Sequence, residues 1–340
     1  MGLPYRQECH LHRCSRHDGA RGAQDHQETH KHQSRRKSRG DPVLMSITVP
    51  TTQPQYQYLA TLTAPFAHGA GSSGNTRLLR THEVVGDDDT TTQVPFLSGA
   101  SIRHGIRSAL AWRIASTCCE PGTMTKSQVD LLWSGGAISS TGAQVDLDLQ
   151  RRVSELLPAL SVLGYAARSD IHEGTARVSD AILVCAENAF RLPEQITAAR
   201  PRRAGAYRGE EFGTRHDTAS TQASRMVAPP DTLDGGTIES TQMIFDTQVL
   251  LPGSQLWGTI GLTPAATTQQ QQSLLAGIGL WARDGIAHLG ASTNAGYGSA
   301  IIDWRGTTTQ THLDEAVEWL DAHLRDHASA IKDLIAEVAR

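Results

Sequence analysis

Five segments of the chain combine apolar, β-branched and aromatic residues in the short, partly alternating runs that are typical of strands. Two of these segments are separated by four residues that begin with Pro252-Gly253, which favours a turn, so we expect a hairpin there. Residues 66–75 are rich in Gly and Ser and predict a loop. The predicted strands are Tyr56–Thr63, Val178–Ala186, Met243–Leu251, Leu256–Leu262 and Ser299–Trp304.

Four other segments repeat apolar residues every three or four positions, which is the spacing of a helix with one buried face. Ser98 or Ser101 is suited to cap the first of them, and Thr311 the last. Pro158 falls inside the second and is expected to disturb it. The predicted helices run from 98–101 through Ile114, over about 147–163, over Gln269–Arg283 and over 312–339.

Without the intervening segments, these elements follow the order strand, helix, strand, strand, helix, strand. That order predicts an α+β, ferredoxin-like fold, which is also the scaffold of the RNA-recognition motif. The predicted domain covers 45–305, with a helical insertion over about 120–175 and a polar, arginine-containing insertion over about 191–240. A C-terminal helix occupies 306–340.

Charge is distributed unevenly along the 340 residues. Residues 1–44 contain 9 Lys and Arg, 5 Asp and Glu and 6 of the 15 His, without periodic apolar residues, so we expect a disordered leader. The remaining chain has 22 basic and 30 acidic residues, a net charge of −8. That balance argues against non-specific binding to duplex DNA but does not exclude a local basic groove.

The sequence also predicts where the protein works. No apolar run reaches the roughly 20 residues needed to span a bilayer, and residues 1–44 lack the apolar core of a secretory signal. The five cysteines, Cys9, Cys14, Cys118, Cys119 and Cys185, form no evenly spaced disulfide framework. We therefore expect a protein of the reducing cytoplasm with no membrane contact.

The leader allows two interpretations. The Cys and His residues between Cys9 and His17 are zinc-ligand types, but no second ligand pair follows at zinc-finger spacing. Met45, followed by Ser-Ile-Thr-Val, makes a natural start, so residues 1–44 also fit an over-extended gene start. We favour an unstructured leader and expect no metal.

A glycine-rich segment imitates a cofactor site. Gly69–Gly74 matches the G-x-G-x-x-G pattern of dinucleotide-binding loops, and Asp87–Asp89 lie near the offset of a ribose-binding acid. Only about 11 residues separate Gly74 from Gly86, too few for both a crossover helix and the next strand. We therefore expect no dinucleotide and no other cofactor.

Three motif-bearing segments occur in order along the chain: Val94–Arg107, Leu251–Gly258 and Gly290–Ser299. Together they resemble the RAMP (repeat-associated mysterious protein) superfamily of CRISPR proteins. Val94–Arg107 is similar to the family's Gly-Ser entry into the first helix, with Ala100 in place of the first of two serines. Leu251–Gly258 is similar to its P-G-S/T hairpin, and Gly290–Ser299 to the glycine-rich loop before the last strand. The order and spacing of these motifs extend the resemblance over roughly residues 56–305.

Further segments indicate which members of the superfamily the chain resembles. Leu163-Gly164 and Arg177–Ala181 are similar to another passage of the family, and Leu131–Gly136 and Pro158–Gly164 are similar to type IV backbone subunits. The resemblance implies a class 1 effector subunit that coats CRISPR guide RNA and oligomerises along it. Its implied partners are the guide RNA, further copies of itself, other effector subunits and target nucleic acid through guide pairing. It also implies a thumb-like hairpin, which we place in the insertion at 191–240.

Holding single-stranded RNA without reading its sequence requires phosphate contacts and stacking. The N–H groups at the entry of the first helix attract phosphate, and Arg103 and Arg107, four residues apart, share a helix face with that entry. Tyr297 is suited to stack on a base or ribose; solvated arginines and a core tyrosine are the plainer alternatives. The predicted RNA-binding residues are Ser98, Gly99, Ser101, Arg103, Arg107, Arg77, Arg80, Arg202, Arg203, Arg215, Asn294, Gly296, Tyr297 and Gly298.

Some members of the resembled superfamily cleave RNA. Target-cleaving relatives use an aspartate in the loop after the first strand; Gly74–Arg80 contains none, and Asp87–Asp89 lie later. Guide-processing relatives use a histidine near the first helix, and His82 and His104 match by position only. We therefore expect a non-catalytic subunit. An RNA endonuclease of the same superfamily is the alternative, and a nucleotide-binding enzyme using Gly69–Gly74 is a third hypothesis.

Overall fold

The computed structural model describes residues 55–86, 90–138, 146–167, 170–196, 201–215, 243–306 and 308–340. They all belong to one unit of the chain, Pro50–Arg340. The predicted leader, its Cys and His residues and Asp87–Asp89 lie outside the described residues. Among the helices that are described, none is long and apolar enough to cross a membrane.

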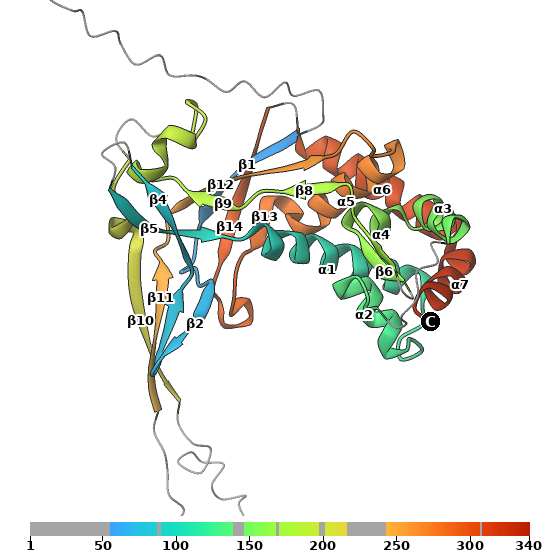
Figure 1. The fold of residues 1–340 in the computed structure, drawn as a ribbon, viewed down its shortest axis with the longest axis horizontal. Coiled ribbons are helices and arrows are strands. Elements are labelled where there is room, and N and C mark those ends of the chain that lie inside the picture. The colour runs from blue at the N-terminus through green and yellow to red at the C-terminus, as the bar shows by residue number, and fades with distance from the viewer. Residues whose placement is uncertain are drawn as a thin grey trace, which may run out of the picture. The chain divides into compact units, whose positions relative to one another are not determined.

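Four neighbouring strands with antiparallel pairing form the centre of the main sheet (Figure 1). In spatial order they are β14 (Ser299–Arg305), β1 (Gln55–Leu62), β12 (Gln255–Leu262) and β9 (Ala181–Leu183), and β8 (Ala176–Val178) also pairs with β12. Helix α1 (Gly99–Cys118) follows β1 in the chain, and α5 (Thr268–Trp281) follows β12. This order and pairing are those of a ferredoxin-like βαββαβ unit. The predicted α+β fold class is confirmed.

The main sheet extends beyond this unit on both sides. β13 (Ile286–His288) adds to β14 at one edge, and β5 (Thr91–Leu97) with β4 (Thr81–Val85) adds to β9 at the other. The sequence reading did not predict β4 or β5. Only Val84 is buried in β4, and Val94 and Pro95 are consecutive buried residues in β5, so neither strand has the regular alternation by which a strand is recognised in a sequence.

Helices α1 and α5 pack against each other and against one face of the main sheet. Alternate residues of β1, including Tyr58 and Leu62, enter the main core with them, whereas Leu59 enters a small cluster on the opposite face. Gly277 interrupts the apolar pattern of α5 for a steric reason, because a Cβ there would lie 2.7 Å from Leu110 Cδ1 of α1. The glycine therefore allows the two helices to approach closely.

The segment between α1 and β8 adds a helical layer beside α1. It contains α2 (Lys126–Ser134), α3 (Leu147–Leu156), α4 (Pro158–Leu163), β6 (Tyr165–Ala167) and β7 (Asp170–His172). The single helix predicted over 147–163 is wrong, since α3 ends at Leu156 and Pro158 is the first residue of α4. Proline lacks an N–H group and its ring excludes a continuous helix, but it fits a first helical position.

A second, four-stranded sheet follows a different pairing from the one predicted. Its strands in spatial order are β10 (Arg208–Arg215), β11 (Met243–Leu250), β3 (Thr76–Leu79) and β2 (Gly69–Ser73). The predicted hairpin between Met243–Leu251 and Leu256–Leu262 is wrong. A turn does form there, with the Ser254 N–H donating to Leu251 O, but β11 pairs with β10 and β3, and β12 pairs with β1. β2 also lies in the segment predicted as a loop.

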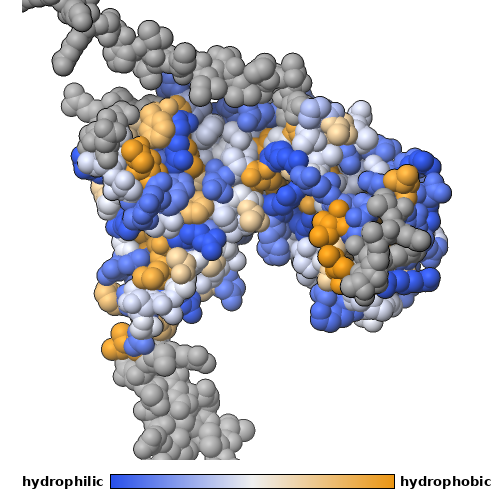
Figure 2. Space-filling model, viewed as in Figure 1, coloured by the Kyte–Doolittle hydropathy of each residue, from blue (hydrophilic) through white to orange (hydrophobic). Residues whose placement is uncertain are grey.

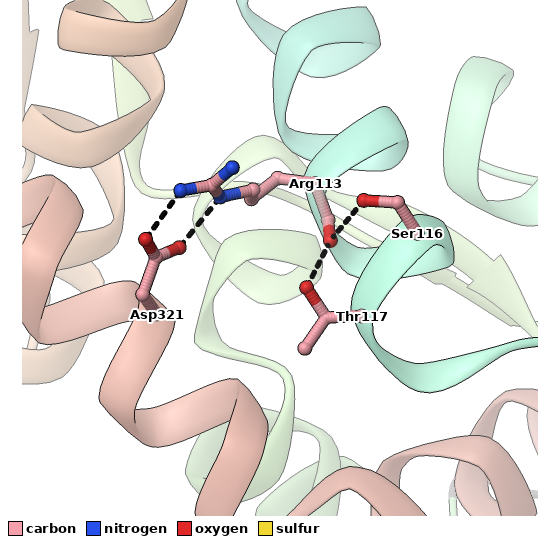
Figure 3. A network of polar contacts seen from close by, with 4 residues as sticks. All are labelled: Arg113, Ser116, Thr117 and Asp321. Atoms are coloured by element: carbon pink, nitrogen blue, oxygen red, sulfur yellow. Dashed lines mark hydrogen bonds and ion pairs between the residues drawn. The ribbon is translucent and has the colours of Figure 1, made fainter.

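Two helices, α6 (Gln310–Asp326) and α7 (Ala328–Val338), replace the single C-terminal helix predicted over 312–339. They divide at His327, and Thr309 rather than Thr311 caps the first, its Oγ1 accepting the His312 N–H at 3.4 Å. α6 is joined to α1 by a two-point contact between the Arg113 guanidinium and the Asp321 carboxylate, in which Nε donates to Oδ1 at 2.6 Å (Figure 3).

The described surface is mixed in polarity. The face drawn in Figure 2 is largely hydrophilic, and its hydrophobic patches are separate from one another. Exposed large apolar residues include Phe190, Phe212 and Ile244, at 59%, 76% and 60% exposure. Scattered apolar residues are ordinary on a protein surface, so only those in a defined setting are used in the functional argument.

Candidate nucleic-acid interface

The entry to α1 is closed by a carboxylate from the protein itself. Ser98 caps the helix, its Oγ accepting the Ser101 N–H at 3.3 Å. The Gly99 N–H donates to Asp180 Oδ1 at 2.8 Å, and a Cβ at Gly99 would overlap Val178 O. The anion attracted to this helix N-terminus is therefore Asp180. Ser98, Gly99 and Ser101 are part of an internal contact, and we assign them to the framework of the site.

Arg103 and Arg107 face inward rather than toward solvent. Arg107 is 8% exposed, and its Nη2 donates to Leu163 O and Gly164 O at 2.8 Å each. Arg103 Nη2 donates to Ala176 O at 3.1 Å. Burial lowers the pKa of both guanidinium groups. Both arginines are therefore reassigned from RNA contact to internal contacts of α1: Arg107 joins α1 to the inserted segment, and Arg103 joins α1 to β8.

The glycine-rich loop meets the four-stranded sheet through Tyr297. A side-chain hydrogen bond with Glu211 of β10, together with burial, raises the pKa of the Tyr297 hydroxyl, and Arg77 lies close enough to oppose that shift. Asn294 and Gly296 are exposed around the short turn Thr293–Ala295, whereas Gly298 is buried with a positive φ of 74°. The loop thus presents its tip to solvent and anchors its base.

Arg77 lies on an aromatic residue of the same sheet. Its Cζ is 5.6 Å from the ring centroid of Phe245, a cation–π geometry, and the side chain remains exposed. The pairing register aligns Arg77 with Thr247, and Thr247 with Glu211, across three strands. Directly paired residues share a sheet face, so Arg77, Glu211 and Tyr297 meet on one face.

Arg80 lies between β3 and β4, beside a buried histidine. His68 is 7% exposed, and its Nε2 accepts the Ser98 N–H at 3.3 Å. Burial lowers the pKa of His68, and the charge of Arg80 lowers it further. Arg80 is exposed, and within the described residues no carboxylate lies at ion-pair distance from it. His68 therefore has a structural role, and Arg80 keeps its charge available to solvent.

The arginines of the second insertion occupy two places. Arg202 and Arg203 are exposed just before the short helix η2 (Ala204–Tyr207), where Arg202 O accepts the Ala186 N–H at 2.9 Å. Arg215 is the last residue of β10 and pairs with Met243 in the register; its side chain lies outside the described part of the structure. Arg77, Arg80, Arg202 and Arg203 are called the arginine rim below.

The structure adds a pair that the sequence analysis did not join. Arg191 ends the short helix η1 (Ala186–Arg191), and its Nη2 lies 2.7 Å from His82 Nε2. The two residues are 109 positions apart, and neither has a local motif that points to the other. The high arginine content of 191–240 was the one available signal for Arg191.

A cleft of about 350 Å³ opens beside the entry to α1. Its lining includes Ser101, His104, Trp281, His288 and Thr293. His104 and His288 are both exposed and come from α1 and β13. The cleft therefore contains two groups suited to general acid–base chemistry near the predicted RNA-binding loop.

The segment Gly69–Gly74, which matches the sequence pattern of a dinucleotide-binding loop, does not have the structure of one. Gly69–Ser73 is an exposed strand that turns directly into Thr76–Leu79, its antiparallel partner. A dinucleotide-binding loop requires a helix to follow the glycines, with its N-terminus at the pyrophosphate. The segment is a hairpin, so its glycine pattern reflects a turn and a bulge rather than a phosphate-binding loop.

Comparison with solved structures provides a structural relative. The fold resembles a chain of a structure described as a Type IV-B CRISPR complex, with a TM-score of 0.52 and 19% sequence identity over 75% of this chain and 92% of that chain. At this identity, the likeness concerns the fold. No family model matches the sequence, and no curated protein matches it.

Proposed function

We propose that this protein is a guide-RNA-binding backbone subunit of a multisubunit CRISPR effector complex, without nuclease activity of its own. The observation that carries the proposal is the exposed arginine rim of a ferredoxin-like core, in which Arg77 lies near Tyr297 of the glycine-rich loop. The fold likeness to a chain of a Type IV-B CRISPR complex supports the same role. The internal hydrogen bonds of Arg103 and Arg107 remove them from the proposed RNA surface.

The proposed surface suits a polyanion that is held without sequence reading. Exposed guanidinium groups contact phosphates and release counterions, while Tyr297 and Phe245 offer aromatic surface. Sequence recognition is then left to base pairing between guide and target. Because the chain outside residues 1–44 carries a net charge of −8, we expect RNA phosphates to be attracted at the arginine rim and not over the rest of the surface.

The β10–β11 hairpin provides a contact for a second copy along the RNA. Phe212 pairs with Asp246, and Thr214 pairs with Ile244, so Phe212 and Ile244 lie on the same sheet face. Both are more than half exposed. This apolar pair faces away from the Arg77 side of the hairpin, so one side can contact RNA while the other contacts the adjacent subunit. Other effector subunits would join at the ends of the assembly.

Co-expression with a CRISPR array tests the proposal. The complete chain is purified from cells with and without the array, and the particle mass and the length of bound RNA are measured. Large particles carrying RNA of uniform length are expected only with the array. Phe212→Ser with Ile244→Ser should shorten the particles without releasing the RNA from each subunit. A monomer without RNA, obtained even with array and partner subunits present, would contradict the proposal.

The cleft supports an endonuclease as the second candidate, because His104 and His288 line the same space. Two histidines can act as acid and base on a ribose 2′-hydroxyl without a metal. Labelled guide-precursor and target RNAs are incubated with the protein in excess EDTA. Cleavage that is lost in His104→Ala, and unaffected in His312→Ala, would favour the endonuclease over the non-catalytic subunit.

A further inference from the structure

The short helix η1 holds an arginine in place with uncharged partners. Asn188 is fully buried, and its Nδ2 donates to Leu183 O at 2.7 Å. The fixed amide then presents Oδ1 to Arg191, whose Nε donates to it at 2.9 Å. Arg191 is exposed, yet its guanidinium is oriented before any ligand arrives. Orientation in advance lowers the entropic cost of binding.

His82 fixes the second side of the guanidinium. A guanidinium has no acceptor, so at the 2.7 Å contact His82 Nε2 accepts and the ring is neutral, with its proton on Nδ1. The ring stacks on Phe96 at a centroid distance of 4.6 Å, which holds its plane. His82 therefore positions Arg191, and the contact makes it unsuited to act as a general base through Nε2.

The Arg191 guanidinium has no carboxylate in direct contact within the described residues. Burial and the Arg191 charge lower the pKa of His82, and burial lowers the pKa of Arg191. Asp180 opposes both shifts, but its carboxylate accepts the Gly99 N–H. An anion that approaches the guanidinium can therefore form a charge-assisted hydrogen bond with it.

An exposed aromatic residue lies next to the arginine in the chain. Phe190 is 59% exposed at the end of η1. The Ala204 N–H donates to the Glu187 carboxylate at 2.9 Å, and Ala186 bonds to Arg202 O, so the arginines before η2 border the same turn. An oriented cation and a solvent-facing ring on consecutive residues form a combination that can bind a single-stranded nucleic acid through phosphate and base.

We propose that η1 is a single-nucleotide site for the RNA strand, in which Arg191 binds a phosphodiester and Phe190 stacks on an adjacent unpaired base. His82 and Asn188 are positioning residues for Arg191. The inference rests on the proposed RNA-binding function and adds a contact that no motif in the sequence indicates. The site takes a single strand, because a base within a duplex has no free face for Phe190.

Fluorescence anisotropy with a labelled, unstructured oligouridine tests the site at several salt concentrations. Arg191→Ala should weaken binding about tenfold and reduce the slope of log Kd against log salt by about 0.7, which corresponds to one phosphate. Phe190→Ala should weaken binding about tenfold without changing that slope. Arg191→Lys should restore the slope. Arg151→Ala and Trp112→Ala are controls, being an exposed arginine and an exposed aromatic residue elsewhere.

A second readout follows His82 directly. A phosphate bound beside Arg191 should raise the pKa of the His82 imidazole, measured by NMR, and an uncharged nucleic-acid analogue should not. If the wild-type protein binds no oligonucleotide, both the proposed function and this site are wrong. If it binds, while both η1 variants behave like the wild type and the pKa of His82 does not move, the site alone is overturned. Melting temperatures of all variants identify any loss of folding.

Discussion

The arginines of α1 and those of the rim have the same side chain but opposite surroundings. Arg107 donates to two backbone carbonyls in a buried setting, and Arg103 donates to a third. Arg77 instead lies on Phe245, and Arg80 is exposed beside a buried histidine. The first pair holds two parts of the protein together, whereas the second pair keeps its charge toward solvent.

The difference shows why a motif position does not establish a ligand contact. Arg103 and Arg107 stand in the Gly-Ser entry to the first helix, where the sequence predicts RNA contact, yet their donors are used within the fold. The rim arginines have no strong motif, yet their guanidinium groups face solvent. What each guanidinium donates to separates the two roles, and the same test can be applied by mutation.

The largest expected effect is the loss of stability in Arg107→Ala. Removing the guanidinium leaves Leu163 O and Gly164 O without their charged donor, so the free energy of unfolding should fall by about 3 kcal/mol. Urea unfolding measures it. Arg151→Ala, which removes an exposed arginine paired with nearby Asp148, should stay within about 0.5 kcal/mol of wild type. Equal stability of the two variants would contradict the framework role.

The reverse result is expected for Arg77→Ala with Arg80→Ala. RNA affinity should fall about tenfold, and the salt slope by about 1.4, because two phosphate contacts are removed. The free energy of unfolding should change little, since both side chains are exposed. Anisotropy and urea unfolding are measured on the same samples, with Arg151→Ala and Arg325→Ala together as the control. Unchanged RNA affinity together with reduced stability would show that Arg77 and Arg80 stabilise the fold and do not bind RNA.

Asp180→Asn sharpens the comparison at the entry of α1. The amide retains an oxygen but loses the charge that the Gly99 N–H and the helix dipole favour, so stability should fall by about 1 kcal/mol. RNA affinity should not fall, because Asp180 is the protein's own anion at this helix entry and not an RNA ligand. A variant with weaker RNA binding at full stability would show that the carboxylate takes part in recognition.

The smallest expected effect is a dependence of stability on pH. The pKa values of His68 and His82 are lowered in the folded protein from the ordinary value of 6.5, so the unfolded chain takes up protons first as pH falls. The free energy of unfolding should therefore decrease as pH drops below about 6.5, and it should not decrease above that. Unfolding at pH 7.5, 6.5 and 5.5 measures the trend. His82→Gln should reduce it, and the exposed His312→Gln should leave it unchanged.

The sequence predicts the parts of this fold whose pattern is local. The apolar repeat from Ile102 to Ile114 matches α1, and the strands at Tyr56 and Leu256 match β1 and β12. The pairing partner of each strand is not predicted in the same way, because the sequence of one segment contains little information about which distant segment it pairs with. The turn at Pro252-Gly253 was therefore assigned to a hairpin that does not form.

The same distinction applies to the candidate site. Tyr297 and Arg77 are recognisable as candidates, but the hydrogen bond with Glu211 and the ring contact with Phe245 depend on the register of β10, β11 and β3. The burial of Arg107 depends on where the inserted helices fold back. Arg191 and His82 meet across 109 residues, so only three-dimensional structure joins them.

The placement of β1 in the middle of the main sheet has a consequence for synthesis. Its partners are β12 and β14, with Gln55 opposite Gly261 and Leu62 opposite Ala300. At a translation rate of roughly 5–20 residues per second, β1 waits about 10–40 s after leaving the ribosome before β12 follows it. Until then, Tyr58 and Leu62 have no sheet to enter, so a nascent chain that stops early is a substrate for chaperones and proteases. Only a chain that has been translated past β14 can build the centre of the sheet.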